Sequence, residues 1–108
     1  MSENRKMERI ACMMGISETE LRILLNVLKK GETTADNLAK ELNVSFPLAN
    51  KYLYKLYQQG LINRIKDPNS KSGRPKYIYV LKADDIKQKM IDIIKKTTDE
   101  MIETIMNN

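Results

Sequence analysis

The chain contains no histidine and only one cysteine, Cys12, among its 108 residues. Histidine is the commonest general base and metal ligand, and a single cysteine cannot complete a zinc site of ordinary composition. One cysteine also excludes an internal disulfide, which fits a reducing compartment. We expect Cys12 to be a small packing residue. Because the carboxylates are spaced as on helix surfaces, with no convergent pair, the sequence predicts neither an enzyme nor a metal site.

Glycine is also scarce, and long apolar runs are missing. The only glycines are Gly15, Gly31, Gly60 and Gly73, so no glycine-rich loop can cradle a phosphate. No apolar run approaches the roughly 20 residues of a membrane span. Residues 1–6 lack the apolar core of a signal peptide. The sequence therefore predicts a cytoplasmic protein that needs no cofactor.

Acidic residues are nearly absent from the centre of the chain. Residues 1–44 hold seven basic and seven acidic side chains, residues 45–82 hold eight and one, and residues 83–108 hold four and six. The net charge of +5 is thus the sum of 0, +7 and −2. One basic zone indicates a face that binds a polyanion, and the alternative is a solvated surface without a partner.

Helix signals dominate the first thirty residues. Residues 3–14 carry an apolar stripe at helical spacing. Ser17 and Glu20 have the spacing of a capping box, which starts a second helix that is apolar on most sides. Gly31 is the expected end of this helix. The pattern is typical of a central helix buried by its neighbours.

Two further helices are predicted close together. Thr34 and Ser45 are the expected N-caps of a short helix that ends near Asn43 and of a helix over about 46–59. Val44 is expected to fill the turn between them from inside. The inner faces should be formed by Leu38, Ala39 and Leu42 on one helix and by Ala49, Leu53 and Leu56 on the other.

Strand patterns appear only after the fourth helix. Residues 62–66 and 77–81 have the alternation and composition of two strands, and the residues between them are typical of turns. They predict an antiparallel hairpin with a protruding basic loop. Residues 83–106 then predict one helix roughly 35 Å long.

Two short helices joined by a tight turn, with polar residues on the outer face of the second, predict a helix-turn-helix that binds duplex DNA. Asn50 can pair with adenine, and Lys51 and Lys55 can reach phosphates or guanine. Phe46 can contact a thymine methyl group or can staple the helix to the preceding one. The candidate residues are Thr34, Ser45, Phe46, Pro47, Asn50, Lys51, Tyr54 and Lys55.

The basic loop of the hairpin is the second candidate contact with DNA. It contributes Lys71, Ser72, Arg74 and Lys76, and Gly73 lets the backbone pass close to sugar and phosphate. Arg74 is placed in the minor groove, where arginine favours narrow A·T tracts. The alternative is an ordinary solvated hairpin tip. These expectations give an α+β fold, mainly α, namely a winged helix-turn-helix with extra N- and C-terminal helices.

Three segments resemble those of known regulators. They are GETTADNLAKEL at 31–42 followed by Val44, KYLYKLYQQGLI at 51–62, and GRPKYIY at 73–79. In this pattern the chain resembles the winged helix-turn-helix transcription regulators of archaea and bacteria, above all the TrmB-like type and more loosely the MarR- and ArsR-like types. The resemblance covers about residues 16–82. It implies DNA binding but not sugar sensing, because nothing here matches the large sugar-binding domain of full-length TrmB-like regulators.

The terminal helices predict a homodimer. Residues 1–15 and 83–108 flank the DNA-binding domain at 16–82, and the stripe of the last helix exceeds what one small domain can cover. We expect an antiparallel or crossed helix interface, with both helices folded onto their own domain as the alternative. The interface candidates are Met7, Ile10, Met14, Met90, Ile94, Met101 and Ile105.

The leading functional prediction is therefore a homodimeric, sequence-specific regulator that binds double-stranded DNA. Two alternatives remain open from the sequence. One is a winged-helix module that docks on another protein, and the other is a nonspecific architectural DNA-binding protein, which would show weak sequence preference and steep salt dependence.

Overall fold

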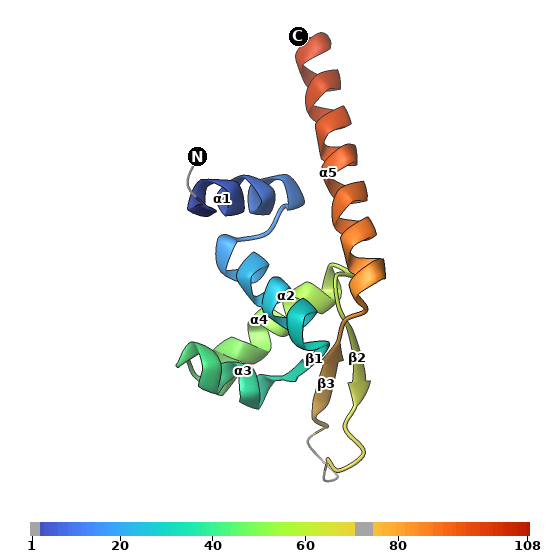
Figure 1. Cartoon of the computed structure of the whole chain (residues 1–108). Helices are drawn as coiled ribbons and strands as arrows, with labels where there is room; N and C mark the ends of the chain where they lie inside the picture. The colour runs from blue at the N-terminus through green and yellow to red at the C-terminus, as the bar shows by residue number, and fades with distance from the viewer. Residues whose placement is uncertain (1–2, 71–74) are drawn as a thin grey trace.

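The computed structural model describes residues 3–70 and 75–108. The candidates Lys71, Ser72 and Arg74 lie outside the described residues. The elements follow in the order α1 (Glu3–Met14), α2 (Glu18–Lys30), β1 (Glu32–Thr34), α3 (Ala35–Leu42), α4 (Phe46–Gln58), β2 (Asn63–Lys66), β3 (Tyr77–Val80) and α5 (Ala83–Met106) (Figure 1). The predicted class, α+β and mainly α, is confirmed.

The central helix α2 is set by local signals at both ends. The Ser17 side chain accepts a hydrogen bond from the N–H of Glu20 at 3.1 Å, and the N–H of Ser17 donates to Glu20 Oε1 at 2.9 Å. This is the predicted capping box. At the other end Gly31 has φ of 87°, a conformation that side chains with a Cβ rarely adopt. Both predicted boundaries of this helix are confirmed.

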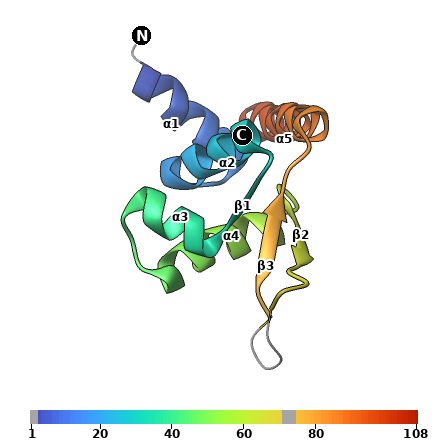
Figure 2. The same cartoon turned by 60° about the horizontal axis from the view of Figure 1, so that its bottom comes forward.

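The sheet has three antiparallel strands rather than two, in the order β1-β3-β2 (Figure 2). Strand β3 is central, so Tyr79 lies opposite both Thr33 of β1 and Arg64 of β2. The sequence predicted the β2–β3 hairpin but missed β1. A strand of three residues between a helix stop and a helix cap carries almost no periodicity, and its partner is far away along the chain.

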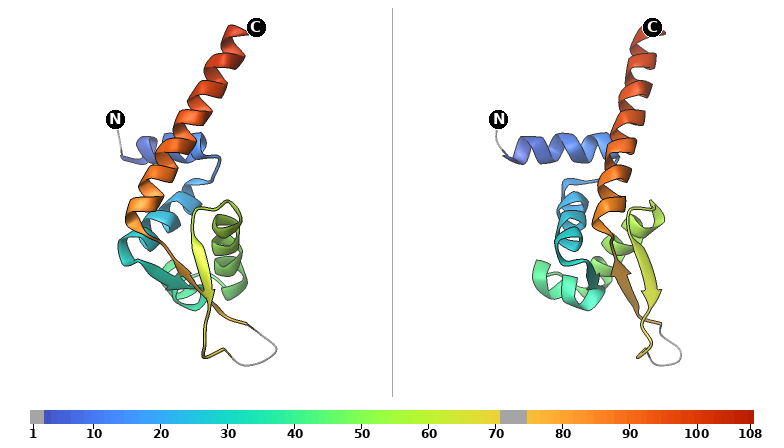
Figure 3. Two further views of the ribbon diagram at one scale, coloured as in Figure 1. Left: turned by 90° about the vertical axis from the view of Figure 1, so that its right-hand side faces the viewer. Right: turned by 45° about the vertical axis from the view of Figure 1, so that its right-hand side comes forward.

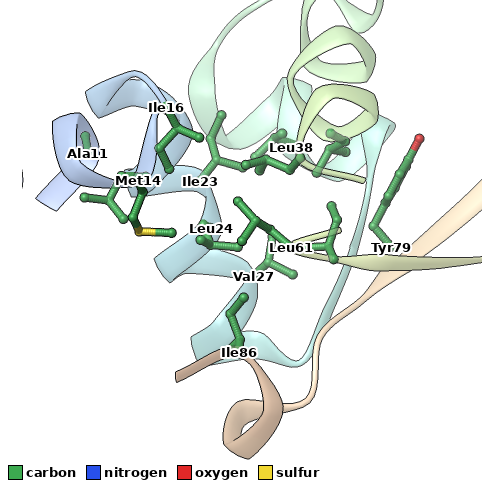
Figure 4. Packing of buried hydrophobic residues seen from close by; sticks show 14 of the residues in the cluster. Ala11, Met14, Ile16, Ile23, Leu24, Val27, Leu38, Leu61, Tyr79 and Ile86 are labelled. Carbon is green, nitrogen blue, oxygen red and sulfur yellow. The ribbon is translucent and has the colours of Figure 1, made fainter. Parts of the chain in front are cut away.

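The core is continuous from α1 to α5 and is lined by every helix and by the sheet. Side chains of α1, α2, α3, the α4–β2 turn, β3 and α5 meet in one cluster (Figure 4). Helix α2 runs through its centre, and Leu21, Leu24 and Val27 have no exposed surface. This burial agrees with the prediction of a central helix, and it fixes α4 and the hairpin on one common scaffold.

Helix α1 packs on its own domain, against α2 and α5. Met7, Ala11 and Met14 are buried within the chain, so the first two methionines proposed for the dimer interface belong to the protomer core. Cys12, by contrast, is exposed, and the expectation that it packs inside was wrong. Successive helical residues point about 100° apart, so Ala11 takes the inner position and Cys12 turns outward.

Helix α5 begins on the domain and then projects far beyond it (Figure 3). Ile86 is buried, while Met90, Ile93 and Ile94 pack against the edge of the core. From Met101 onward every side chain is exposed, and the molecule measures 55 × 26 × 25 Å. Among the described residues, no helix combines the length and the hydrophobicity that crossing a membrane requires.

Candidate nucleic-acid interface

The turn between α3 and α4 is built by a left-handed asparagine. Asn43 has φ of 54° and ψ of 48°, a region that Asn enters more readily than most residues. The N–H of Val44 donates to the Ala39 carbonyl at 3.0 Å, and the Val44 side chain packs on the core as predicted. Leu42, predicted to face inward, is instead 38% exposed, because Val44 takes the inner position beneath the turn.

Both helices of this pair start at the predicted caps. The Thr34 hydroxyl accepts from the N–H of Asn37 at 3.1 Å, and the Ser45 hydroxyl accepts from the N–H of Leu48 at 3.3 Å. Each cap satisfies a backbone donor that would otherwise lack a partner in the first helical turn. Thr34 and Ser45 therefore have a clear structural role in addition to the binding role expected from the sequence.

One side of α4 faces the core and the other faces solvent. Ala49, Leu53 and Leu56 have no exposed surface, which confirms the predicted inner stripe. The opposite side is exposed, although Tyr54 and Lys55 at its edges contact Arg64 and Glu20 of the domain. The exposed candidates on this side are Ser45, Phe46, Pro47, Asn50, Lys51, Tyr54 and Lys55.

A groove of about 660 Å³ lies between the α3–α4 pair and the hairpin. Four of the predicted residues line it, namely Thr34, Phe46, Asn50 and Lys76. Phe46 is 46% exposed and lines the groove, so part of its ring is accessible from it. The remaining lining residues are Ala35, Asp36, Arg64, Asp67, Pro75, Tyr77 and Tyr79.

The lysines of this face differ in what they bind within the protein. Lys55 Nζ lies 3.1 Å from the Glu20 carboxylate, and Lys76 Nζ lies 3.6 Å from that of Asp36. Lys51 is exposed and forms no ion pair with any residue that the structure describes. Lys51 is thus the lysine of α4 with the least competition for an external anion.

Arg64 of β2 joins the hairpin to α4, and the sequence analysis did not single it out. Its guanidinium carbon lies 3.9 Å from the ring centroid of Tyr77, 4.3 Å from that of Tyr57 and 5.4 Å from that of Tyr54. Burial alone would lower the pKa of Arg64, but the hydrogen bond with the Tyr79 side chain and charge interactions with Tyr77, Tyr79 and Tyr57 together outweigh it, and the net shift is upward. Arg64 therefore holds α4 and the hairpin together through its contacts with the aromatic rings.

Arg64→Met should lower the free energy of unfolding by about 1–2 kcal/mol, since cation–π contacts with partly exposed rings are lost. Lys66→Met in the same strand is the matched control, because the exposed Lys66 has no ion pair with a described residue. Urea denaturation of both variants and of the native protein measures the difference. Equal stability of the two variants would contradict the role assigned to Arg64.

Across residues 3–70 and 75–108, no group of three or more histidine, cysteine, aspartate or glutamate side chains is arranged to hold a metal ion. The chemistry that the face offers is instead that of hydrogen bonding and charge. It presents an amide, hydroxyls, an aromatic ring and lysines on one rigid scaffold, which are the groups that contact base edges and phosphates.

Residues 10–85 match the family model of the sugar-specific transcriptional regulator TrmB. Transcription factor E of Methanocaldococcus jannaschii is 33% identical over 81 residues, which cover 73% of this chain and 43% of that protein. The chain spans 66% and 43% of the lengths of two of the curated relatives that it matches, and 74% of a third.

Solved structures share the fold at lower sequence identity. The ST1889 protein of the archaeon Sulfolobus tokodaii superposes with a TM-score of 0.78 at 24% identity, covering 97% of this chain and 99% of that one. Staphylococcus aureus MepR, solved bound to an oligodeoxyribonucleotide, gives 0.65 at 22% identity, covering 97% of this chain and 74% of that one. The arrangement of α2 to β3 is therefore that of winged-helix proteins.

Proposed function

Because the chain belongs to the TrmB family of transcription regulators, we propose that it is a cytoplasmic homodimer that binds a specific double-stranded DNA site. Helix α4 lies in the major groove, and the loop between β2 and β3 contacts the minor groove or the backbone. The single observation that carries this proposal is the groove between α4 and the hairpin, which brings Thr34, Phe46, Asn50 and Lys76 together.

Each element of the face has a distinct role in this proposal. Asn50 forms a bidentate pair with adenine, and Lys51 binds a phosphate. Ser45 and the first N–H groups of α4 hold a second phosphate at the positive end of the helix dipole. Residues 45–82 carry a net charge of +7, so the attraction to DNA comes from the segment that forms the face.

The loop extends the contact along the duplex. Lys76 binds the backbone, and Lys71, Ser72 and Arg74, which lie outside the described residues, continue the basic run of the sequence toward the minor groove. Arg74 reads the narrow groove of A·T-rich DNA through its charge. Recognition of bases thus depends on α4. The loop adds affinity and a preference for A·T-rich DNA on either side of the bases that α4 contacts.

Two copies associate through α5. Ile91, Ile94, Thr98, Met101 and Ile105 follow one another at alternating spacings of three and four residues, the pattern of a coiled-coil seam. The exposed apolar side chains of α5 lie on or beside this seam. A two-fold dimer would set two recognition helices about 34 Å apart, one turn of DNA.

The charges of α5 favour an antiparallel pair. Just before Thr98 the helix carries Lys95 and Lys96, and just after it the acidic side chains Asp99, Glu100 and Glu103 follow. Antiparallel pairing centred near Thr98 sets these two lysines of each copy beside the acidic side chains of the other. Parallel pairing would set like charges together, which costs stability.

A module that docks on another protein is the second candidate. The observation that favours it is the pairing of Lys55 with Glu20 and of Lys76 with Asp36, which leaves fewer cations of this face free for phosphates. The concentration of positive charge in residues 45–82 favours DNA over such a partner, since docking on a protein requires no basic loop.

Fluorescence anisotropy with the gene's own upstream duplex and with a scrambled duplex of equal composition, over a salt series, tests the proposal. We expect tighter binding to the upstream duplex that survives moderate salt, with a ratio on the order of 10³ or more. A duplex selected from a random pool replaces the upstream DNA if that shows no preference.

The remaining outcomes point to the other candidates. Equal binding to all duplexes that collapses as salt rises indicates an architectural protein, because only phosphate contacts then contribute. Absence of binding at low salt supports the protein-docking module.

A further inference from the structure

Glu20 is a buried carboxylate that the DNA-binding face does not use. It lies in the first turn of α2 with 2% of its surface exposed. Oε1 accepts the capping hydrogen bond from the Ser17 N–H at 2.9 Å and a second one from Lys55 Nζ at 3.1 Å. Oε2 has no partner among the described residues. A negative charge buried here is stabilised only by these few hydrogen-bond donors.

The two halves of this ion pair come from different parts of the fold. Glu20 belongs to the helix at the centre of the core, and Lys55 belongs to α4, 35 residues later in the sequence. Burial raises the pKa of Glu20, but hydrogen bonds involving Ser17 and Lys55 outweigh it, and the net shift is downward. The carboxylate is therefore ionised at neutral pH and holds the ammonium by charge.

Lys55 lies on a different flank of α4 from Tyr54 and Tyr57. Tyr54 and Tyr57 turn toward Arg64 and the hairpin. Lys55 turns toward α2. Helix α4 is thus held on one flank by Arg64 among the tyrosine rings and on the other by the Glu20–Lys55 ion pair. The exposed Lys51 takes part in neither contact.

We propose that Glu20 is a positioning residue for DNA recognition: by holding Lys55 it fixes the rotation of α4 on the domain, and Lys55 serves as a strut instead of a phosphate contact. This rests on the proposed function, since rotation of α4 matters only if α4 reads bases. The opposite possibility is that Glu20 competes with DNA and releases Lys55 to a phosphate on binding. Removing the charge of Glu20 distinguishes them. DNA binding should weaken if Glu20 positions α4, and it should strengthen if Glu20 competes with DNA for Lys55.

Glu20→Gln, Lys55→Met and the double variant test this, with Lys51→Met as the matched control one turn away on α4. Glutamine can still accept the Ser17 hydrogen bond, so the capping box survives while the charge is lost. Anisotropy over a salt series, with the selected duplex and a scrambled one, gives affinity, specificity and salt slope. Thermal unfolding sets a working temperature at which all variants are folded.

The salt slope is the steepness with which the logarithm of the affinity falls against the logarithm of the salt concentration. We expect Lys51→Met to reduce it by about one, because one phosphate contact is lost. Glu20→Gln and Lys55→Met should leave the slope unchanged and each weaken binding to the selected duplex about 10-fold, by the general cost of misplaced base contacts. Affinity for the scrambled duplex should hold, and the double variant should be no worse than either single one, because both remove the same link.

Several results would overturn the inference. A slope reduced by Lys55→Met identifies Lys55 as a phosphate contact, and tighter, more salt-dependent binding by Glu20→Gln identifies Glu20 as a competitor of DNA. Unchanged specificity in folded variants reduces the pair to a purely structural role. A native protein that does not discriminate between duplexes defeats the proposed function and this inference together, whereas discrimination by the native protein with unaffected variants defeats the inference alone.

Discussion

Replacing Ile102 and Ile105 by lysine is expected to turn a dimer into a monomer and to weaken binding to a two-fold DNA site by about 100-fold or more. The two side chains are 54% and 72% exposed on the projecting part of α5, so neither supports the fold of the protomer. In the antiparallel pair, lysines at these positions would lie against apolar side chains of the partner helix, where a charge is costly to bury. Sedimentation at micromolar concentration measures the mass, and anisotropy measures the affinity.

The control must add the same charge to α5 away from the seam. Gln88→Lys in α5 together with Asn107→Lys just after it adds the same charge at two exposed positions outside the seam. This control should remain dimeric and keep its affinity for DNA. A native protein that sediments as a single species of 12.5 kDa would contradict the proposed dimer. Dimers of the lysine variant would locate the interface elsewhere.

The parts of the fold that the sequence predicted are those that depend on near neighbours. Ser17, Thr34 and Ser45 cap helices because a hydroxyl reaches an N–H two or three residues on, and such spacing is visible in the chain itself. The inner stripe of α4 followed from helical periodicity for the same reason. The boundaries of α1 and α5 agree with the predicted ranges 3–14 and 83–106.

What was missed depends on contacts between distant residues. Strand β1 exists because β3 supplies its hydrogen bonds, and the Glu20–Lys55 pair exists because α2 and α4 cross. Arg64 among its tyrosines needed the register of the hairpin, which a ten-residue connection between β2 and β3 does not determine. In each case the signal could be recognised only once the packing of the elements was known.

The candidate site was predicted to a similar extent. Outward positions on α4 followed from the inner stripe, and four predicted residues do line the groove. Charge predicted the site less well. It indicated Lys51, Lys55 and Lys76 equally, whereas Lys55 and Lys76 form ion pairs with acidic residues of the domain. A count of basic residues predicts the presence of an electrostatic face but not which cations remain available on it.

Asn50→Ala is expected to relax the choice of base at one position of the DNA site, at about 1–3 kcal/mol or roughly 5- to 150-fold in affinity. Asn50 is exposed on α4 and lines the groove, and its amide offers the donor and the acceptor that adenine requires. Alanine is a good helix former and the position is outside the core, so the variant should fold as the native protein does.

The measurement that checks this compares both proteins on the selected duplex and on every single-base substitution of it. For Asn50→Ala the loss should be confined to duplexes that carry the native base at one position, and discrimination at that position should disappear. Lys51→Ala is the control, because loss of a phosphate contact weakens binding to all duplexes alike and lowers the salt slope. If Asn50→Ala also weakened every duplex equally, Asn50 would contact the backbone, and base recognition by α4 would have to come from other residues on its outer side.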